Sequence, residues 1–184
     1  MLNNKLSENF FEGRIIVNRG IVYDGVPSEE ELASCPGVPS ESRMRQGRVA
    51  VIECVQEIPC NPCSYSCKQG AITIGEQITN LPHLDEDKCT GCGQCVANCP
   101  GLAITIMDKS YSEEEAIIDF PFEYLPLPEE NQVVDAVNRY GEVVCKGIVK
   151  KVKQVKAYAG TTIISLIIPM EFADEVRSMK RLEK

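Results

Sequence analysis

Apolar and polar positions alternate most regularly in the last third of the chain. Valine and isoleucine alternate with lysine over much of Glu142–Lys156, and residues 161–168 form a β-rich apolar run. Alternation with a period of two, bounded by a glycine-containing turn such as Tyr140–Gly141, is typical of strands. We therefore expect a small β-rich unit over residues 132–184, ending in a short amphipathic helix over Glu171–Lys184.

The N-terminal residues 1–46 have weaker patterning and are predicted to form an extension. Two short apolar stretches, Arg14–Asn18 and Gly20–Tyr23, are candidate strands. Ser28 and Glu31 have the capping-box spacing that begins a short helix. A stretch rich in proline, serine and glycine then follows from Cys35, which indicates a loop.

Residues 47–107 contain an internal repeat. A short apolar stretch follows each of two cysteine runs, Gly70–Ile74 after the first and Gly101–Ile106 after the second, and a candidate strand, Arg48–Glu53, precedes both runs. We expect each half to pass from a cysteine-rich loop through a turn of helix into a strand. The expected fold class is α+β, a pseudo-twofold module. So small a unit cannot bury much apolar surface, so we expect metal ligation to supply much of its folding energy.

A linker is predicted between these two regions, over residues 108–131. It contains the acidic run Glu113–Glu115 and then three prolines, Pro121, Pro126 and Pro128. Because proline favours extended backbone without internal hydrogen bonds, we expect this arm to run along a surface.

Eight of the ten cysteines fall in the two runs of residues 47–107. The first run contains Cys54, Cys60, Cys63 and Cys67, and the second contains Cys89, Cys92, Cys95 and Cys99, followed by Pro100. The second run has the C-x2-C-x2-C-x3-C-P spacing of bacterial ferredoxins. Two such runs indicate two [4Fe–4S] clusters, and therefore a bacterial-type dicluster ferredoxin module.

The fourth cysteine of such a run ligates the other cluster in two-cluster ferredoxins. Carried onto this chain, this rule assigns the ligands as two sets of four. Cluster one takes Cys54, Cys60, Cys63 and Cys99, and cluster two takes Cys89, Cys92, Cys95 and Cys67. Gly91 and Gly93 tolerate positive φ, so their loop can direct amide N–H groups at cluster sulfurs, which raises the potential.

Two departures from the spacing leave alternatives open. Five residues, Val55–Pro59, separate the first two cysteines where the tight motif has two. Cluster one could therefore be a [3Fe–4S] centre, or could recruit Cys35 in place of Cys54. Lys68 follows the first run at the position where Pro100 follows the second run. Lys68 is either a cation near cluster two or a solvated surface lysine. Four-cysteine zinc sites are a further alternative, but they have no use for a third equally spaced cysteine.

The remaining reactive residues indicate no catalytic site. We expect Cys35 to be a free thiol in a loop, Cys145 to be a small core residue, and His83 to have a surface or packing role. His83 is the only histidine, and the chain has neither a nucleophile motif nor a phosphate-binding glycine loop. The chain should therefore bind no nucleotide or flavin itself, and should be a non-catalytic subunit.

Composition limits the partners. The formal charge is −8, and each oxidised cluster with four thiolates adds about −2. Such a chain repels nucleic acid and anionic membranes and suits a basic docking face on a protein. No apolar stretch approaches the roughly 18 residues that would span a bilayer, and the N-terminus has no apolar signal region. We expect a soluble cytoplasmic protein.

The cysteine-rich segments also resemble a particular family. Glu53–Cys63 and Cys89–Gly101 resemble dicluster ferredoxin-like proteins that accompany FAD-dependent amino-acid or amine dehydrogenases of the proline dehydrogenase, opine oxidase and sarcosine oxidase kind. Leu125–Pro128, Arg139–Val144 and Thr161–Pro169 are similar to that family too. The resemblance implies an electron-transfer subunit of a hetero-oligomeric complex. An FAD-containing dehydrogenase subunit would oxidise an amino or imino acid, and electrons would pass through the two clusters to a further acceptor.

Two other functions remain open from the sequence. One is a free, diffusing ferredoxin that serves several oxidoreductases, and the other is a metal-stabilised interaction protein without redox activity. About two thirds of the chain lies outside residues 47–107, which favours a subunit with permanent contacts. Residues 132–184 would then be either a docking unit or a structural cap over the module.

Overall fold

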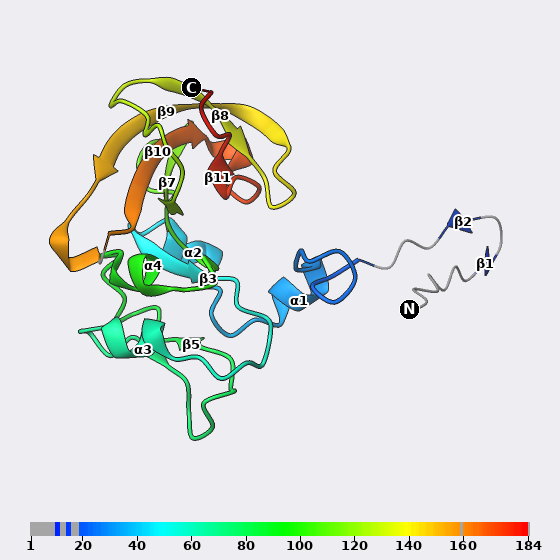
Figure 1. Cartoon of the computed structure of the whole chain (residues 1–184). Coiled ribbons are helices and arrows are strands. Elements are labelled where there is room, and N and C mark those ends of the chain that lie inside the picture. Colours follow the sequence, from blue (N-terminus) through cyan, green and yellow to red (C-terminus); the bar gives the residue numbers. More distant parts are fainter. Residues whose placement is uncertain (1–9, 12–13, 16–18, 159, 184) are drawn as a thin grey trace.

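The computed structural model describes residues 10–11, 14–15, 19–158 and 160–183, and combines short helices with a larger proportion of strand (Figure 1). The helices are α1 (Glu29–Ala33), α2 (Glu41–Met44), α3 (Pro62–Ser66), α4 (Gln94–Asn98) and the 3-10 turns η1 (Lys156–Tyr158) and η2 (Met170–Phe172). The strands are β1 (Phe10–Phe11), β2 (Arg14–Ile15), β3 (Val49–Ile52), β4 (Ile72–Thr73), β5 (His83–Leu84), β6 (Ile104–Asp108), β7 (Glu115–Phe122), β8 (Val133–Val137), β9 (Val143–Lys153), β10 (Thr162–Pro169) and β11 (Ser178–Met179).

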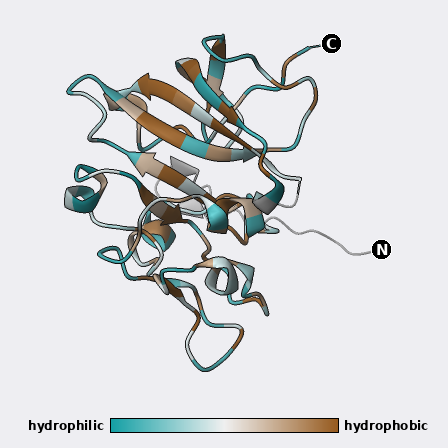
Figure 2. Ribbon diagram, turned by 90° about the vertical axis from the view of Figure 1, so that its left-hand side faces the viewer, coloured by the Kyte–Doolittle hydropathy of each residue, from teal (hydrophilic) through white to brown (hydrophobic). Residues whose placement is uncertain are grey.

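A seven-stranded antiparallel sheet organises the fold. Its strand order is β11-β8-β9-β10-β7-β6-β3. The central strands β7 and β10 are buried along nearly their whole length, with Phe120, Phe122 and Leu166 at 2% exposure or less. Figure 2 shows this concentration of hydrophobic residues along the strands of the sheet. Residues of this sheet therefore form most of the hydrophobic core.

The sequence predicted a cysteine module, a linker and a separate C-terminal β-rich unit. The sheet does not follow this division, because strands from all three regions belong to it. Strands β3 and β6 come from residues 47–107, and β8 to β11 come from residues 132–184, yet all of them belong to one sheet. The join is β7, which pairs with β6 on one side and β10 on the other. The C-terminal residues therefore continue the sheet that carries the cysteine runs.

The predicted extended arm over residues 108–131 is also wrong, because β7 lies inside it. The prolines suggested a segment without strand pairing, but only Pro121 lies within β7. The pairing of β6 with β7 reaches only as far as Asp119, so at Pro121 the strand pairs with β10 alone. A proline is tolerated there because no ladder hydrogen bond to β6 is needed.

The predicted amphipathic helix over Glu171–Lys184 is wrong as well. The described part of this segment contains η2 and β11 instead. The amide of Arg177 donates to the Val137 carbonyl at 2.9 Å, and that of Lys180 donates to the Asp135 carbonyl at 2.8 Å. Pairing with β8 thus satisfies backbone groups that a helix would satisfy internally, while the apolar Val176 is still fully buried.

Local predictions near the N-terminus had mixed outcomes. The capping box is confirmed, because the Ser28 amide donates to Glu31 Oε2 at 2.7 Å and the Glu31 amide donates to Ser28 Oγ at 3.2 Å. Residues 20–23 form a turn, closed by the Tyr23 amide donating to the Gly20 carbonyl at 2.9 Å, so the strand expected there is wrong. The candidate strand at residues 14–18 is described only over β2, and residues 16–18 lie outside the described residues.

The strand prediction at Arg48–Glu53 is confirmed as β3, and those over residues 142–156 and 161–168 are confirmed as β9 and β10. In the described part of the chain, no helix is long and apolar enough to cross a membrane.

Candidate cofactor sites

Two small cavities bring the eight cysteines of the two runs together in two groups of four. Cavity one is lined by Cys54, Cys60, Cys63 and Cys99, and cavity two by Cys67, Cys89, Cys92 and Cys95. Their volumes are similar and small, about 30 Å³ and about 20 Å³. Each cavity therefore has three thiols from one run and one from the other. These are the same two groups that the sequence assigned to the two clusters, and iron binding by them stays a prediction.

The helices α3 and α4 explain how a cysteine reaches the cavity of the other half. Each helix carries the third cysteine of its run, Cys63 in α3 and Cys95 in α4, and each ends at the fourth, Cys67 or Cys99, in extended backbone. The two helices pack against each other, with α4 next to the sheet (Figure 1). The extended C-cap thus directs each fourth cysteine across the α3–α4 contact.

The walls around the thiols are apolar. Ile52, Ile74 and Ile104 line cavity one, and Ile72 and Ile106 line cavity two. Burial raises the pKa of the Cys63 thiol to about 11 and that of Cys95 to about 12. Without a metal these thiols are therefore protonated at neutral pH, and binding a metal at either cavity would release protons.

Backbone amides already donate to ligand sulfurs at cavity two. The Ala50 amide lies 3.4 Å from Cys89 Sγ, and the Ala71 amide lies 3.3 Å from Cys67 Sγ. Such bonds favour the thiolate over the thiol. The donor set at this cavity therefore fits a thiolate-bound cofactor.

The cavities differ from a site for a single metal ion. Among the residues that the structure describes, no three His, Cys, Asp or Glu side chains are close enough to hold one ion. The four thiols of each group line one cavity. A [4Fe–4S] cubane takes four thiolates, which is the number that each group supplies.

The loop Cys89–Cys95 of cavity two is fixed from outside. Arg48 donates from Nε and Nη2 to the Gly91 carbonyl, both at 3.4 Å, and the Tyr158 hydroxyl donates to the Cys92 carbonyl at 3.3 Å. Gly91 has a φ of +61°, and a Cβ at this position would lie 2.5 Å from Arg48 Cβ. Gly91 is therefore required both for its backbone conformation and for the approach of β3.

Replacing Gly91 by alanine is expected to disrupt cavity two, because the new Cβ would meet Arg48 and its backbone. Iron content should fall from about eight per chain to about four if two cubanes are normally bound. Gly101→Ala is the matched control, because nothing lies within 4 Å of a Cβ there and no positive φ is involved. Iron and sulfide analysis of anoxically purified protein measures both, and full iron in Gly91→Ala would contradict this role.

Either Cys54 or Cys35 was a candidate for the fourth thiol at cavity one. Cys54 lines the cavity despite the five-residue gap, and Ile58 from that gap lines it too. Cys35 is buried but does not line the cavity, and its Sγ donates to the carbonyls of Ile52 at 3.2 Å and Cys54 at 3.5 Å. The structure thus favours Cys54 over Cys35 as the fourth thiol.

The other singled-out residues lie away from the cavities. Lys68 and His83 are exposed, and Cys145 is half-buried against the core. Neither Lys68 nor His83 is among the residues that line the two cavities. These positions fit the surface role expected for His83 and the solvated alternative for Lys68.

Two ion-pair clusters near the cysteine runs were missed by sequence reasoning. Glu53, next to Cys54, accepts from Arg139 at 2.6 and 2.8 Å and from Arg177 at 2.7 and 2.8 Å. Burial alone would raise the pKa of Glu53, but the two guanidinium groups outweigh it and lower that pKa. No local pattern could have revealed this cluster, because 86 and 124 residues separate Glu53 from its partners.

The second cluster is centred on Asp119 of β7, whose side chain is 1% exposed. Asp119 Oδ2 accepts from Arg48 Nη2 and from Lys153 Nζ, the latter at 2.5 Å. Burial would raise the pKa of Asp119, but Arg48 and Lys153 outweigh it and lower that pKa. The cluster therefore ties β3, β7 and β9 together beside the loop of cavity two.

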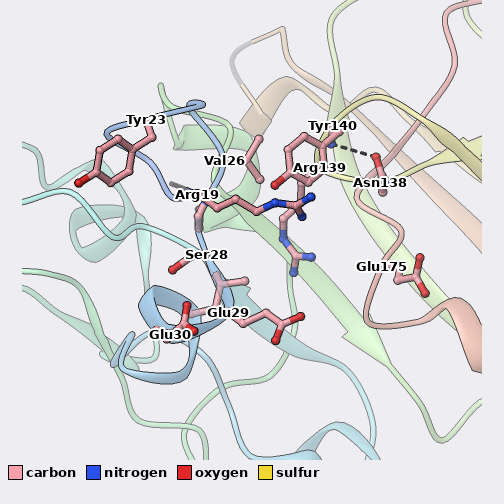
Figure 3. A pocket seen from close by; sticks show the side chains of 12 residues that line it. Arg19, Tyr23, Val26, Ser28, Glu29, Glu30, Asn138, Arg139, Tyr140 and Glu175 are labelled. Atoms are coloured by element: carbon pink, nitrogen blue, oxygen red, sulfur yellow. Dashed lines mark hydrogen bonds between the residues drawn. The ribbon is translucent and has the colours of Figure 1, made fainter. Parts of the chain in front are cut away.

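A wider groove lies elsewhere, between residues 19–32 and the turn that joins β8 to β9 (Figure 3). Its volume is about 570 Å³, and it is open to solvent over much of its extent. Arg19 and Arg139 face carboxylates such as Glu29 and Glu175 across it, and no cysteine lines it. The groove is therefore separate from the two cysteine-lined cavities.

Comparison with known families agrees with the chemistry of cavity two. Residues 82–105 match the family described as a 4Fe-4S binding domain. This segment contains all four cysteines of the second run, three of which line cavity two. The first run lies outside the match. The chain therefore contains a ferredoxin-type 4Fe–4S binding segment, and a second cluster is left to argue from the structure.

Several curated proteins are similar over parts of the chain. A component of an ion-translocating oxidoreductase complex from Methanosarcina acetivorans is 45% identical over 49 residues, which are 27% of this chain and 17% of the relative. The ferredoxin-type protein NapF of Escherichia coli K12 is 38% identical over 52 residues, which are 27% of this chain and 32% of the relative. Protein Pixie of Drosophila melanogaster is 30% identical over 113 residues, which are 53% of this chain and 18% of the relative.

The chain thus spans about a third or less of the length of each of these relatives. No solved structure matches the chain.

Proposed function

We propose that this chain is a non-catalytic electron-transfer subunit that holds two [4Fe–4S] clusters, one in each cysteine-lined cavity. When bound, each cubane takes up and releases one electron. The observation that carries the proposal is the exchange of Cys67 and Cys99 between the two groups of thiols. With both clusters bound, the exchange would link the two sites through iron–thiolate bonds and hold them near enough for direct electron transfer.

The chain's own residues supply ligation and an apolar environment. The eight thiols would bind as thiolates, and isoleucines such as Ile52 and Ile106 would exclude water from the sites. Amides on β3 and after α3 would donate to ligand sulfurs, as those of Ala50 and Ala71 do. No group in the described residues is needed for bond-breaking chemistry under this proposal.

We further propose that the electrons come from a partner flavoprotein that oxidises an amino or imino acid, and go to another acceptor. The name of the relative from Methanosarcina acetivorans, a component of an ion-translocating oxidoreductase complex, supports membership of such a complex. The flavoprotein part rests only on the sequence resemblance of Glu53–Cys63 and of the later segments. The integration of residues 132–184 into the sheet gives the chain more surface than a small carrier needs, which favours a subunit over a free ferredoxin.

Anoxic purification of the tagged chain from its native host tests this function. The expected result is co-purification with a flavin-containing protein, and visible absorbance that bleaches with dithionite and returns on reoxidation. Elution of all the iron–sulfur absorbance near 20.4 kDa would favour the free ferredoxin instead. Absorbance that does not bleach would contradict both redox functions.

A further inference from the structure

We infer that cavity two holds its cluster at a higher reduction potential than cavity one, and that Arg48 and Tyr158 are the positioning residues that produce this difference. The inference rests on the proposed two-cluster function and adds a direction to it. An electron that enters at cavity one would then move favourably to cavity two. Three differences between the cavities carry it.

The first difference is the orientation of two peptide groups in the loop of cavity two. The Gly91 carbonyl accepts from Arg48, and the Cys92 carbonyl accepts from Tyr158. Both donors lie outside the cavity, since neither lines it. In a trans peptide the N–H points opposite to the C=O. The amides of Cys92 and Gly93 are therefore directed away from Arg48 and Tyr158, toward the cavity side of the loop.

The corresponding amides at cavity one are fewer. Aligning Cys60–Cys63 with Cys92–Cys95 places Pro62, which has no N–H, opposite Gln94. The Cys60 amide, opposite that of Cys92, donates to the Ile78 carbonyl at 3.3 Å. The Cys60 amide is thus already used, and Pro62 has no amide where Gln94 has one. Hydrogen bonds to cluster sulfurs raise the reduction potential, so the additional amides raise the potential of the cluster in cavity two.

The second difference concerns ligand sulfurs. Cys89 Sγ and Cys67 Sγ, both at cavity two, accept well-aligned amide hydrogen bonds. No such bond to a cavity-one sulfur occurs among the described residues. Weaker amide contacts are present at both cavities, from Ser64 to Cys63 and from Val96 to Cys95, and Gln56 contacts Cys54. These contacts do not remove the excess of aligned donors at cavity two.

The third difference is the placement of cations. Each cavity has one buried carboxylate with two basic partners nearby, so net charge alone does not separate them. At cavity two, Arg48 also donates directly to the cysteine loop. At cavity one, Arg139 and Arg177 donate to Glu53 and to carbonyls of residues 173–176. Arg43 Nη2 donates to the Cys89 carbonyl of the same loop at 2.7 Å, so two guanidinium groups contact the cysteine loop of cavity two, and Arg48 is the only residue of these ion pairs that does so.

The test is an anoxic redox titration of the full chain, monitored by EPR, with two one-electron waves expected. Arg48→Gln should lower the higher wave only. One lost charge-assisted hydrogen bond corresponds to about a tenfold fall in the reduced-to-oxidised ratio at fixed potential, or about 59 mV for a one-electron couple. Arg48→Lys, which keeps the charge but not the fork, should shift the same wave less. Arg45→Gln is the control, because the pair of Arg45 with Glu41 lies on the surface.

Tyr158→Phe gives a milder variant if Arg48→Gln fails to fold, because it removes only the hydroxyl that reaches Cys92. It should lower the higher wave in the same direction. Pro62→Ala restores an N–H at the start of α3 and should raise the lower wave. A shift of the lower wave by Arg48→Gln or Tyr158→Phe, or of neither wave, would overturn the inference. A single wave with about four irons per wild-type chain would overturn the two-cluster function instead.

Discussion

Replacing Cys67 by alanine is expected to remove the same cluster that Cys92→Ala removes, although Cys67 belongs to the other cysteine run. Both thiols line cavity two, together with Cys89 and Cys95. Cys99→Ala should by the same reasoning match Cys60→Ala, because both of those thiols line cavity one. The variants are thus expected to group by the cavity that each thiol lines. Each pair then combines one cysteine from the first run with one from the second.

Iron content and EPR of the reduced proteins measure this pattern. Each variant should keep about four of about eight irons, and the remaining spectrum should be the same within each pair. Cys145→Ala is the matched control, because Cys145 lies in β9 away from both cavities, and it should keep both clusters. Matching spectra for Cys60→Ala and Cys67→Ala would show that each run binds its own cluster and would contradict the exchange.

Asp119→Asn is expected to destabilise the protein by about 3 kcal/mol, because it leaves Arg48 and Lys153 without the charge that pairs them. Asp119 is almost fully buried, whereas Arg48 is 34% exposed and Lys153 is 21% exposed, so both can recover some hydration. For a chain of this size the loss corresponds to a fall of about 10 °C in the thermal midpoint. Asp135→Asn is the control, because its pair with Lys146 lies on the surface and should matter little.

The lowered pKa of Asp119 also predicts how the stability difference between wild type and Asp119→Asn depends on pH. The pKa of Asp119 is lowered in the folded protein, so its stabilising effect is complete above the ordinary carboxyl pKa, about 3.9. That effect is lost only as the pH falls through the lowered value. The difference in thermal midpoint between wild type and Asp119→Asn should therefore stay constant between about pH 5 and pH 8. A difference that shrinks as the pH falls from 8 to 5 would show that the pKa of Asp119 is raised.

The cysteine spacing, together with the ligand exchange of two-cluster ferredoxins, predicted the two groups of four thiols that line the two cavities, and ligation by them stays a prediction. Ligand spacing is a local property, and the exchange between halves follows from a repeat that places a cysteine at the end of each short helix. The helical turns α3 and α4 and strands β3 and β6 were likewise expected from the repeat. What spacing could not supply was the difference between the cavities, which depends on Arg48 and Tyr158 from distant parts of the chain.

The strand patterns of β9 and β10 were correct, but their place in the fold was not. Alternation predicts that a segment is a strand and says nothing about its neighbours. Both β6 and β10 pair with β7, and the prolines in and near β7 led to the wrong prediction of a linker there. The apolar periodicity of residues 171–184 failed for a related reason, since edge pairing with β8 supplied the hydrogen bonds that a helix would have made.

The central claim is that one chain binds two cubanes through eight cysteines, and Mössbauer spectroscopy with iron, sulfide and zinc analysis of anoxically purified wild-type protein tests it most directly. The expected result is about eight irons and about eight acid-labile sulfides per chain, all in [4Fe–4S] sites, with no zinc. About four irons per chain, three-iron centres in the fresh protein, or zinc in place of iron would contradict it.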